Sequence, residues 1–340
     1  MSEHTIMPGV EIIFEAVHGS QAFGLDGPGS DIDIKGIVIG PADWYHGFSE
    51  APEQLILNKI HTLYDIRKFF RLAIEANPTA LEMLWAPTTC IKASTAAAER
   101  LLASREKFLS QRVADSFGKY ALSQLRRIKT HRRWLLQPPT EQPQRRQFDL
   151  PAKPLISGDQ MGAADALLKS GKIASEEISP NFLLMLDRER SYRAAQKEWQ
   201  QYEAWKRERN PARAALEEKF GYDTKHALHL VRLLRMALEI LTSGEVIVRR
   251  PDREELLAVK QGAWKFDDLI DYAERTQQQV QQARAASPLP ELPDKAELNL
   301  LCSEIIGECL NDQNEKLELG REFVSRNSAG HRILLVGITG

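Results

Sequence analysis

The chain is poor in cysteine, in long apolar runs and in excess charge of either sign. Its 340 residues include only Cys90, Cys302 and Cys309, and none of them forms a C-x-x-C pair. This number and spacing predict neither a disulfide framework nor a cysteine zinc site. No run of 18 apolar residues occurs, and the first ten residues lack a basic start followed by an apolar core. We therefore expect a cytoplasmic protein in a reducing compartment, with no membrane segment.

The charge of the chain is nearly balanced, but one segment is strongly basic. A formal net charge of −2 argues against a nucleic-acid binder that is basic throughout. The segment RRIKTHRR holds five cations and no acid, namely Arg126, Arg127, Lys129, Arg132 and Arg133. Its flanks have a helical pattern. Two interpretations stay open, a solvated helix face and an electrostatic contact with a polyanionic partner.

Two carboxylates on one short segment are the strongest sign of chemistry. Strand side chains alternate between faces, so Asp31 and Asp33 are expected on one face, with Ile32 and Ile34 in the core. Two carboxylates so close repel each other unless a divalent cation neutralises both. Mg²⁺ prefers such oxygen ligands and takes its remaining ligands from water and substrate phosphate. The pair therefore predicts a magnesium site.

A Gly-Ser turn precedes this pair by about ten residues. The apolar segment EIIFEAV (11–17) predicts a strand that ends at Gly19 and Ser20. Backbone N–H groups in such a turn are able to hold phosphate oxygens. A phosphate-sized turn beside a metal site indicates chemistry on a nucleoside triphosphate.

Three blocks of sequence resemble a known family. The segment HGSQAFGLDGPGSDIDIKGIVIG (18–40) resembles the signature of the DNA polymerase β-like nucleotidyltransferase superfamily. Residues 65–85 and 222–245 resemble its RNA-repair-pathway branch. The resemblance implies transfer of a nucleoside monophosphate from a triphosphate to an acceptor hydroxyl, with release of pyrophosphate. It further implies that Asp31 and Asp33 hold Mg²⁺ or Mn²⁺, and that Gly19 and Ser20 bind the β and γ phosphates.

The family pattern also implies a third carboxylate on a neighbouring strand, and here the sequence departs from it. The expected strand QLILNKIHTLY (54–64) carries no acid. Asp65, at the end of this strand, is the nearest substitute and our predicted third catalytic residue. His61 is an alternative as a general base.

A second candidate group of residues lies on the helix expected after Gly221. Asp223 or Thr224 is expected to cap this helix, and Gly244 to end it. Lys225, His229 and Arg232 form a cationic stripe on an otherwise apolar helix. Burying unpaired cations costs several kcal/mol, so the stripe must face water or an anion. Two interpretations stay open: a stripe that faces solvent, and a stripe that binds the nucleotide from the helical side of the site through Lys225, His229 and Arg232, as the resemblance implies.

The overall pattern predicts an α+β fold. Residues 10–65 are rich in strand signals and the pattern turns helical from Asp65 onward. The resemblance implies a polymerase β-like mixed sheet flanked by helices, followed by a mainly helical C-terminal region. We expect a catalytic domain over 1–136, a proline-rich connector over 137–154 and a helical substrate- or nucleotide-closing domain over 155–340.

The acceptor is the least specified part of the predicted reaction. The basic segment and the resemblance favour RNA, either tRNA or an RNA end, bound through the five cations of 126–133. A protein or a small-molecule acceptor, as in toxin-like or antibiotic-modifying enzymes, stays open. A third hypothesis is a catalytically weakened module that binds nucleotide or RNA, and the missing carboxylate on strand 54–64 supports it.

Overall fold

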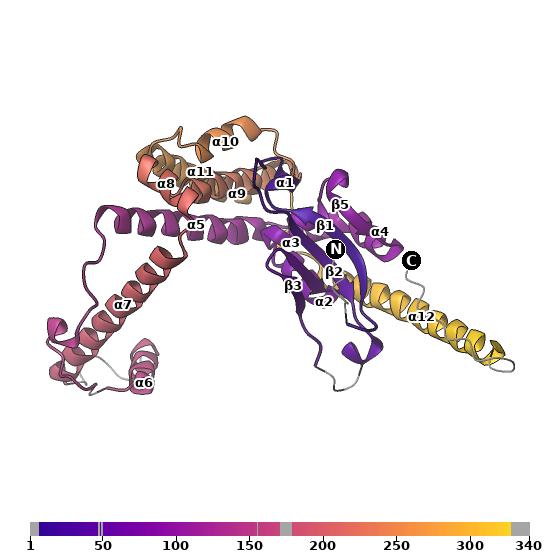
Figure 1. The fold of residues 1–340 in the computed structure, drawn as a ribbon, viewed down its shortest axis with the longest axis horizontal. Helices are drawn as coiled ribbons and strands as arrows, with labels where there is room; N and C mark the ends of the chain where they lie inside the picture. Colours follow the sequence, from indigo (N-terminus) through magenta and orange to yellow (C-terminus); the bar gives the residue numbers. More distant parts are fainter. Residues whose placement is uncertain (1–6, 47, 49, 155, 171–178, 328–340) are drawn as a thin grey trace. The chain divides into compact units, whose positions relative to one another are not determined.

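The computed structural model describes residues 7–46, 48, 50–154, 156–170 and 179–327 (Figure 1). The chain divides into two compact units, one of residues 1–125 and 226–340, the other of residues 126–225. Both divisions fall inside helices, α5 (Arg112–Leu136) and α9 (Thr224–Ser243). The contacts therefore do not divide the chain at the predicted boundaries of 136 and 155, because the part after residue 225 packs with the N-terminal part.

The first unit contains a five-stranded mixed sheet in the order β3-β4-β2-β1-β5 (Figure 1). The strands are β1 (Glu11–His18), β2 (Asp33–Ile39), β3 (Gln54–Asn58), β4 (His61–Asp65) and β5 (Ile91–Ser94). The pair β2 and β4 is parallel and the other three pairs are antiparallel. Ile37 and Val38, on opposite faces of β2, are both buried, so both faces of the sheet are covered. The predicted α+β fold is confirmed.

The single strand predicted over 54–64 is wrong, because the structure has two strands there. β3 and β4 form an antiparallel hairpin. The side chain of Asn58 accepts a hydrogen bond from the backbone N–H of Ile60 at 2.9 Å, which turns the chain between them. Asn side chains favour such local turns over a continuous strand.

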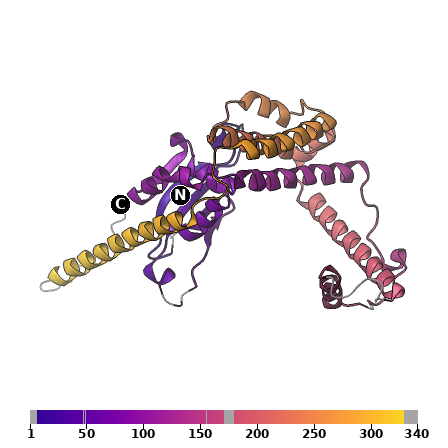
Figure 2. The same ribbon diagram turned by 180° about the vertical axis from the view of Figure 1, so that it is seen from behind.

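Helices α2 (Ile66–Ile74) and α3 (Pro78–Leu84) begin directly after residues whose side chains cap them. Asp65 caps α2 through the N–H of Arg67, and Asn77 caps α3 through the N–H of Ala80. The last helix packs against α2 and α4, as Figure 2 shows from behind. Besides α5 and α9, the helices described in the first unit are α1 (Ser20–Phe23), α2 (Ile66–Ile74), α3 (Pro78–Leu84), α4 (Ala96–Ala103), α10 (Arg253–Lys260), α11 (Phe266–Ala286) and α12 (Lys295–Asn327).

Helix α9 has the limits that its sequence predicts. It starts at Thr224 and ends at Ser243, where Gly244 takes a left-handed φ of 72°. Leu230, Val231 and Leu234 are buried along it. Within the described ranges, no helix is both long enough and apolar enough to cross a membrane.

The second unit is helical. Besides the end of α5 it holds α6 (Gly158–Lys169), α7 (Pro180–Glu208) and α8 (Pro211–Phe220). Ile156, Met161 and Leu186 form a small core where α6 meets α7. The expected connector over 137–154 is irregular apart from a short 3₁₀ turn at Arg145–Phe148.

Candidate functional site

The Gly-Ser turn and the second carboxylate lie against each other. Backbone pairing places His18, the last residue of β1, opposite Asp33, the first residue of β2. Gly19 follows with φ of 70° and ψ of −144°, a region that only glycine adopts readily. A Cβ atom on Gly19 would stand 2.7 Å from Oδ2 of Asp33. The missing side chain therefore makes the room that the Asp33 carboxylate occupies beside the turn.

Asp31 lies just before the sheet. Because β2 begins at Asp33, Asp31 belongs to the extended segment that enters the strand, and it is exposed. A turn precedes it, in which Gly27 and Ser30 exchange two hydrogen bonds of 3.0 Å. The core position predicted for Ile32 is wrong, since this side chain is 46% exposed. The strand that would have buried it starts one residue later.

A network of buried ionisable side chains packs next to the Gly-Ser turn. Nε2 of His18 lies 3.1 Å from Oε2 of Glu82 on α3, and the guanidinium of Arg232 on α9 pairs with Oε1 of the same carboxylate. The guanidinium also stacks on the ring of Phe23, with its central carbon 3.7 Å from the ring centroid. Both Glu82 and Arg232 are almost fully buried. These contacts connect α3 to the end of β1 through His18, and α9 to the short helix α1 through Phe23.

The charge state of Glu82 follows from these partners. Burial by itself raises its pKa, but the positive charge of Arg232 and the hydrogen bond with His18 outweigh burial and lower the pKa to about 2. Glu82 is therefore ionised at neutral pH. Sequence reasoning missed this residue, although an acid within the apolar helix segment PTALEML is a signal that could have found it.

Two backbone contacts hold the far end of α1. The N–H of Arg250 donates to the carbonyl of Phe23 at 3.0 Å, and Nε of Arg253 donates to the carbonyl of Gly24 at 2.5 Å. The segment that follows α9 thus fixes the short helix after the turn. Four bonded or stacked groups from distant parts of the chain thus meet residues 18–24, from Glu82, Arg232, Arg250 and Arg253.

The three predicted nucleotide ligands on α9 differ in their surroundings. Lys225 is exposed and His229 is half-buried. Arg232 is buried, and the anion that it meets is the Glu82 carboxylate. A role of Lys225 and His229 in nucleotide binding stays a prediction.

Neither Asp65 nor His61 joins Asp33 on its face of the sheet. The parallel register places Asp65 beside Val38, five residues along the strand from Asp33, which corresponds to about 16 Å. The Asp65 carboxylate accepts hydrogen bonds from Tyr45 and Arg67. His61 pairs with Ile34, so it belongs to the opposite sheet face from Asp33, where its Nε2 lies 2.7 Å from Oε1 of Glu15.

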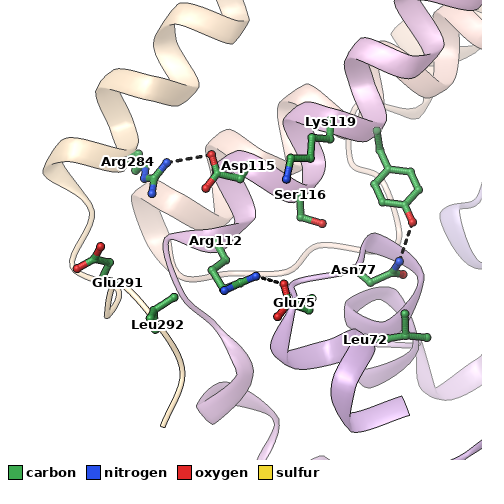
Figure 3. Close-up of a pocket in the computed structure, with 11 residues that line it drawn as sticks. Leu72, Glu75, Asn77, Arg112, Asp115, Ser116, Lys119, Arg284, Glu291 and Leu292 are labelled. Atoms are coloured by element: carbon green, nitrogen blue, oxygen red, sulfur yellow. Dashed lines mark hydrogen bonds and ion pairs between the residues drawn. The ribbon is translucent and has the colours of Figure 1, made fainter. Parts of the chain in front are cut away.

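A charged cavity of 350 Å³ lies elsewhere in the same unit (Figure 3). Ion pairs cross it, one between Arg112 and Glu75 and one between Arg284 and Asp115, the second at 3.0 Å. None of the predicted site residues lines it. We therefore place the candidate site at the Gly-Ser turn.

Substitution of Gly19 tests the geometry of the turn. We expect Gly19→Ala to lose about 1–3 kcal/mol of unfolding free energy, because its backbone conformation is strained for other residues. The new methyl group also meets the Asp33 carboxylate, so nucleotide binding is expected to weaken as well. Chemical denaturation and titration with nucleotide measure the two effects.

Gly29→Ala is the matched control for this experiment. Gly29 has a φ of 79° but no atom within 4 Å of an added Cβ. This variant should lose stability from strain while it keeps nucleotide binding. Equal loss of nucleotide binding in both variants would contradict the proposed contact.

A Gly-Ser turn that leads from one strand to a carboxylate on its neighbour, in a mixed sheet flanked by helices, is the arrangement that the resemblance of the motifs implies. The resemblance predicted from the motifs is confirmed, since residues 1–137 match the RNA repair pathway DNA polymerase beta family. This match supports a nucleotidyltransferase.

Part of the chain is also similar to a bacterial protein. The uncharacterized protein YcgL of Bacillus subtilis (strain 168) is 34% identical over 94 residues, which are 26% of this chain and 36% of that protein. The chain thus spans about a third of the length of this relative. No solved structure matches the chain.

Proposed function

We propose that the protein is a metal-dependent nucleotidyltransferase that moves a nucleoside monophosphate from a triphosphate to an acceptor hydroxyl, and that this acceptor is RNA, either tRNA or an RNA end. The single observation that carries the proposal is the contact between the Gly19 turn and the Asp33 carboxylate. A metal ligand and a phosphate-sized turn must adjoin for a metal ion to bridge protein and triphosphate.

The residues at the turn fit Mg²⁺ or Mn²⁺. Asp31 and Asp33 offer the carboxylate oxygens that these ions prefer, and Asp31 is exposed to an incoming metal–triphosphate complex. A metal ion held by these residues would supply positive charge that offsets the triphosphate and would lower the pKa of the attacking hydroxyl. Gly19 and Ser20 hold the β and γ phosphates, and the network of His18, Glu82 and Arg232 keeps the turn in position.

Other residues of the site take proposed roles that need their own variants. Lys225 and His229 bind triphosphate oxygens, so loss of either should raise the KM for nucleotide more than it lowers kcat. Asp65 serves as the third carboxylate only if the β2–β4 register is rearranged in the complex. Its capping of α2 argues for a structural role instead.

Turnover with labelled triphosphates tests the proposed activity. We expect incorporation of label into RNA with Mg²⁺ or Mn²⁺, and loss of it with a chelator, because the metal carries the triphosphate charge. ATP, GTP, CTP and UTP are compared separately, and pyrophosphate release is measured in parallel. Label that appears on a protein or a small molecule but not on RNA would redirect the proposal to those acceptors.

A catalytically weakened nucleotide-binding module is the second candidate. Asp65 lies five residues from Asp33 along the strand register, and this distance favours the binding module. Asp65 then does not supply the third carboxylate that the resemblance implies beside Asp31 and Asp33. The same assay separates the two candidates. A module binds triphosphate with metal but releases no pyrophosphate at any acceptor.

The basic segment of α5 provides a test of RNA as the acceptor. Arg126 and Arg127 are exposed, whereas Arg132 donates to the carbonyl of Gly221 at 2.9 Å and Arg133 pairs with Glu198. We expect Arg126→Glu/Arg127→Glu to weaken RNA binding. Each lost phosphate contact should reduce the slope of log affinity against log salt by about 0.7 for single-stranded RNA.

The control is Lys92→Glu/Arg275→Glu, which reverses two exposed cations outside the basic segment. It should leave the salt slope unchanged, and neither double variant should alter triphosphate binding. An Arg126→Glu/Arg127→Glu protein that binds and labels RNA like the wild type would exclude this surface as the RNA contact.

A further inference from the structure

Two arginines lie beside the end of the short helix that follows the Gly-Ser turn. Arg253 donates a hydrogen bond from Nε to the carbonyl of Gly24 at 2.5 Å. A Cβ atom on Gly24 would stand 3.7 Å from Cγ and 3.9 Å from Cζ of Arg249, so the guanidinium of Arg249 lies next to this glycine. Both arginines are exposed, and both belong to the same unit as the turn.

No acid neutralises these two cations. The acids that follow them or face them along the chain are held by other arginines, in the pairs Arg235–Asp252, Arg235–Glu255 and Arg250–Glu239. In the part of the chain that the structure describes, no carboxylate forms an ion pair with Arg249 or Arg253. Two cations side by side repel each other, and a bound anion removes this repulsion. The pair therefore indicates a site for a negatively charged ligand.

The backbone around Arg249 is anchored on both sides. Val248 and Arg250 are buried. The N–H of Arg250 donates to the carbonyl of Phe23 at 3.0 Å, and its guanidinium binds the Glu239 carboxylate through two bonds of 2.6 Å. Arg249 therefore extends from a fixed position next to α1, and less conformational freedom is lost when it binds a ligand.

The position of the two arginines suits the far end of a triphosphate. For transfer, the α phosphate has to stand at the metal site of Asp31 and Asp33, while the β and γ phosphates bind at Gly19 and Ser20. The terminal phosphate is then the one farthest from the aspartates. Gly24 directly follows the four residues of α1, which puts it about 6 Å beyond Ser20. Long side chains beside Gly24 are within reach of a phosphate at this distance.

We propose, on the basis of the proposed function, that Arg249 and Arg253 bind the terminal phosphate of the triphosphate. Guanidinium groups form charge-assisted and often bidentate hydrogen bonds with phosphate oxygens, which gives them both affinity and geometric selectivity. A nucleoside diphosphate lacks the group that they contact. The two residues thus determine that the site takes triphosphates in preference to diphosphates, and they also contact the pyrophosphate product.

Titration calorimetry of the full-length protein with Mg²⁺ tests the contact. ATP, GTP, CTP and UTP are each compared with the corresponding diphosphate, so that the result does not depend on the base. We expect Arg249→Met to weaken triphosphate binding about 10-fold, because a hydrogen bond between charged groups contributes roughly that factor. Diphosphate binding should stay as in the wild type, and inorganic pyrophosphate should lose affinity as the triphosphates do.

Three further variants separate the charge of Arg249 from its place in the fold. Arg249→Lys keeps the charge but loses the fork of N–H groups, so it should recover only part of the triphosphate affinity. Arg249→Met/Arg253→Met should bind triphosphate more weakly than Arg249→Met alone. Arg275→Met is the matched control, because it removes an exposed arginine of α11 in the same unit, and it should bind like the wild type. Thermal unfolding checks that each variant is folded.

The possible outcomes distinguish this contact from the proposed function. A folded Arg249→Met protein that binds triphosphates like the wild type would overturn the contact, even where the wild type transfers labelled nucleotide. Equal weakening of triphosphate and diphosphate would also overturn it, since the terminal phosphate would then not be the group bound. Weaker RNA binding with unchanged triphosphate binding would assign the pair to the acceptor instead. A wild-type protein that binds no triphosphate with metal would overturn the proposed function and this contact together.

Discussion

Asp33→Asn is expected to lower nucleotidyl transfer at least roughly 1000-fold while the fold stays intact. A metal ion supplies several kcal/mol of charge stabilisation in the transition state, and each 1.4 kcal/mol or so is tenfold in rate. The amide keeps the shape of the carboxylate beside Gly19 but loses its negative charge. Single-turnover rates with saturating metal and triphosphate measure the loss, and thermal unfolding measures the fold.

Asp26→Asn is the matched control, because Asp26 is an exposed acid in the same loop and precedes the turn at Gly27–Ser30. It should transfer like the wild type. An Asp33→Asn enzyme that retains turnover close to the wild type would remove Asp33 from the metal site and with it the proposed mechanism.

Arg232→Met is expected to have the largest effect on stability. The substitution leaves Glu82 buried without its cationic partner, and breaking a buried pair costs about 3–5 kcal/mol. Denaturant unfolding at pH 7 measures the change. The double variant Glu82→Gln/Arg232→Met should recover part of the loss, because it removes the buried charge as well.

The loss of stability caused by Arg232→Met should become smaller at low pH. The pKa of Glu82 is lowered by folding to about 2, so its ionised form stabilises the fold at all pH values above its ordinary pKa of 4.5. That stabilisation is lost as the pH falls from about 4.5 toward 2. The difference between wild type and Arg232→Met should therefore shrink over this range.

Arg71→Met provides the comparison with an exposed pair. Arg71 pairs with Glu53 at 2.5 Å, and both side chains are more than half exposed. Solvent screens such pairs, so this variant should change stability little. If Arg232→Met proves no more destabilising than Arg71→Met, the buried network does not support the turn.

The local features of the site follow from the sequence alone. The spacing of Gly19 and Ser20 from Asp31 and Asp33 predicts a turn beside a carboxylate, and the structure has Asp33 against Gly19. The limits of α9 are likewise predicted, from Asp223 or Thr224 at its start and Gly244 after its end. These features depend on backbone preferences and contacts over a few residues, which the sequence states directly.

Local sequence patterns did not predict where the chain turns within 54–64 or where β2 begins. The segment 54–64 has a continuous apolar pattern, yet a side-chain bond at Asn58 divides it into two strands. Ile32 has the alternation of a buried strand residue, yet the sheet begins one position after it. A one-residue difference in where pairing starts decides burial, and periodicity does not resolve such a difference.

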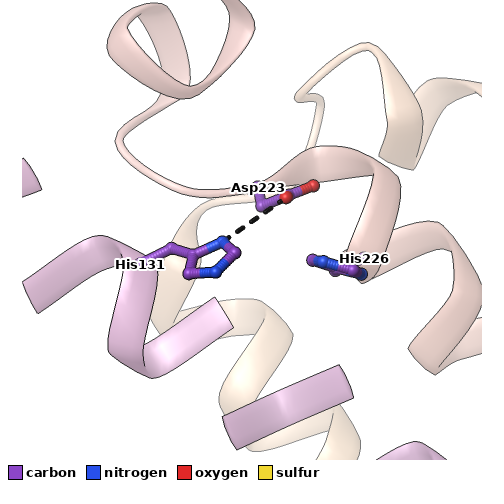
Figure 4. Close-up of side chains that lie close together, drawn as sticks. All are labelled: His131, Asp223 and His226. Carbon is purple, nitrogen blue, oxygen red and sulfur yellow. Dashed lines mark ion pairs between the residues drawn. The ribbon is translucent and has the colours of Figure 1, made fainter. Parts of the chain in front are cut away.

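Only the tertiary structure decided which distant groups meet. Glu82 and Arg232 are 150 residues apart in the chain, and their pairing converts an expected phosphate ligand into a buried support of the turn. The sheet register sets Asp65 five residues away from Asp33. His131 likewise meets Asp223 through packing between helices (Figure 4). The sequence determined the turn, the aspartates and the helix ends, while packing between distant segments determined their partners, because no local pattern encodes which buried charge faces which.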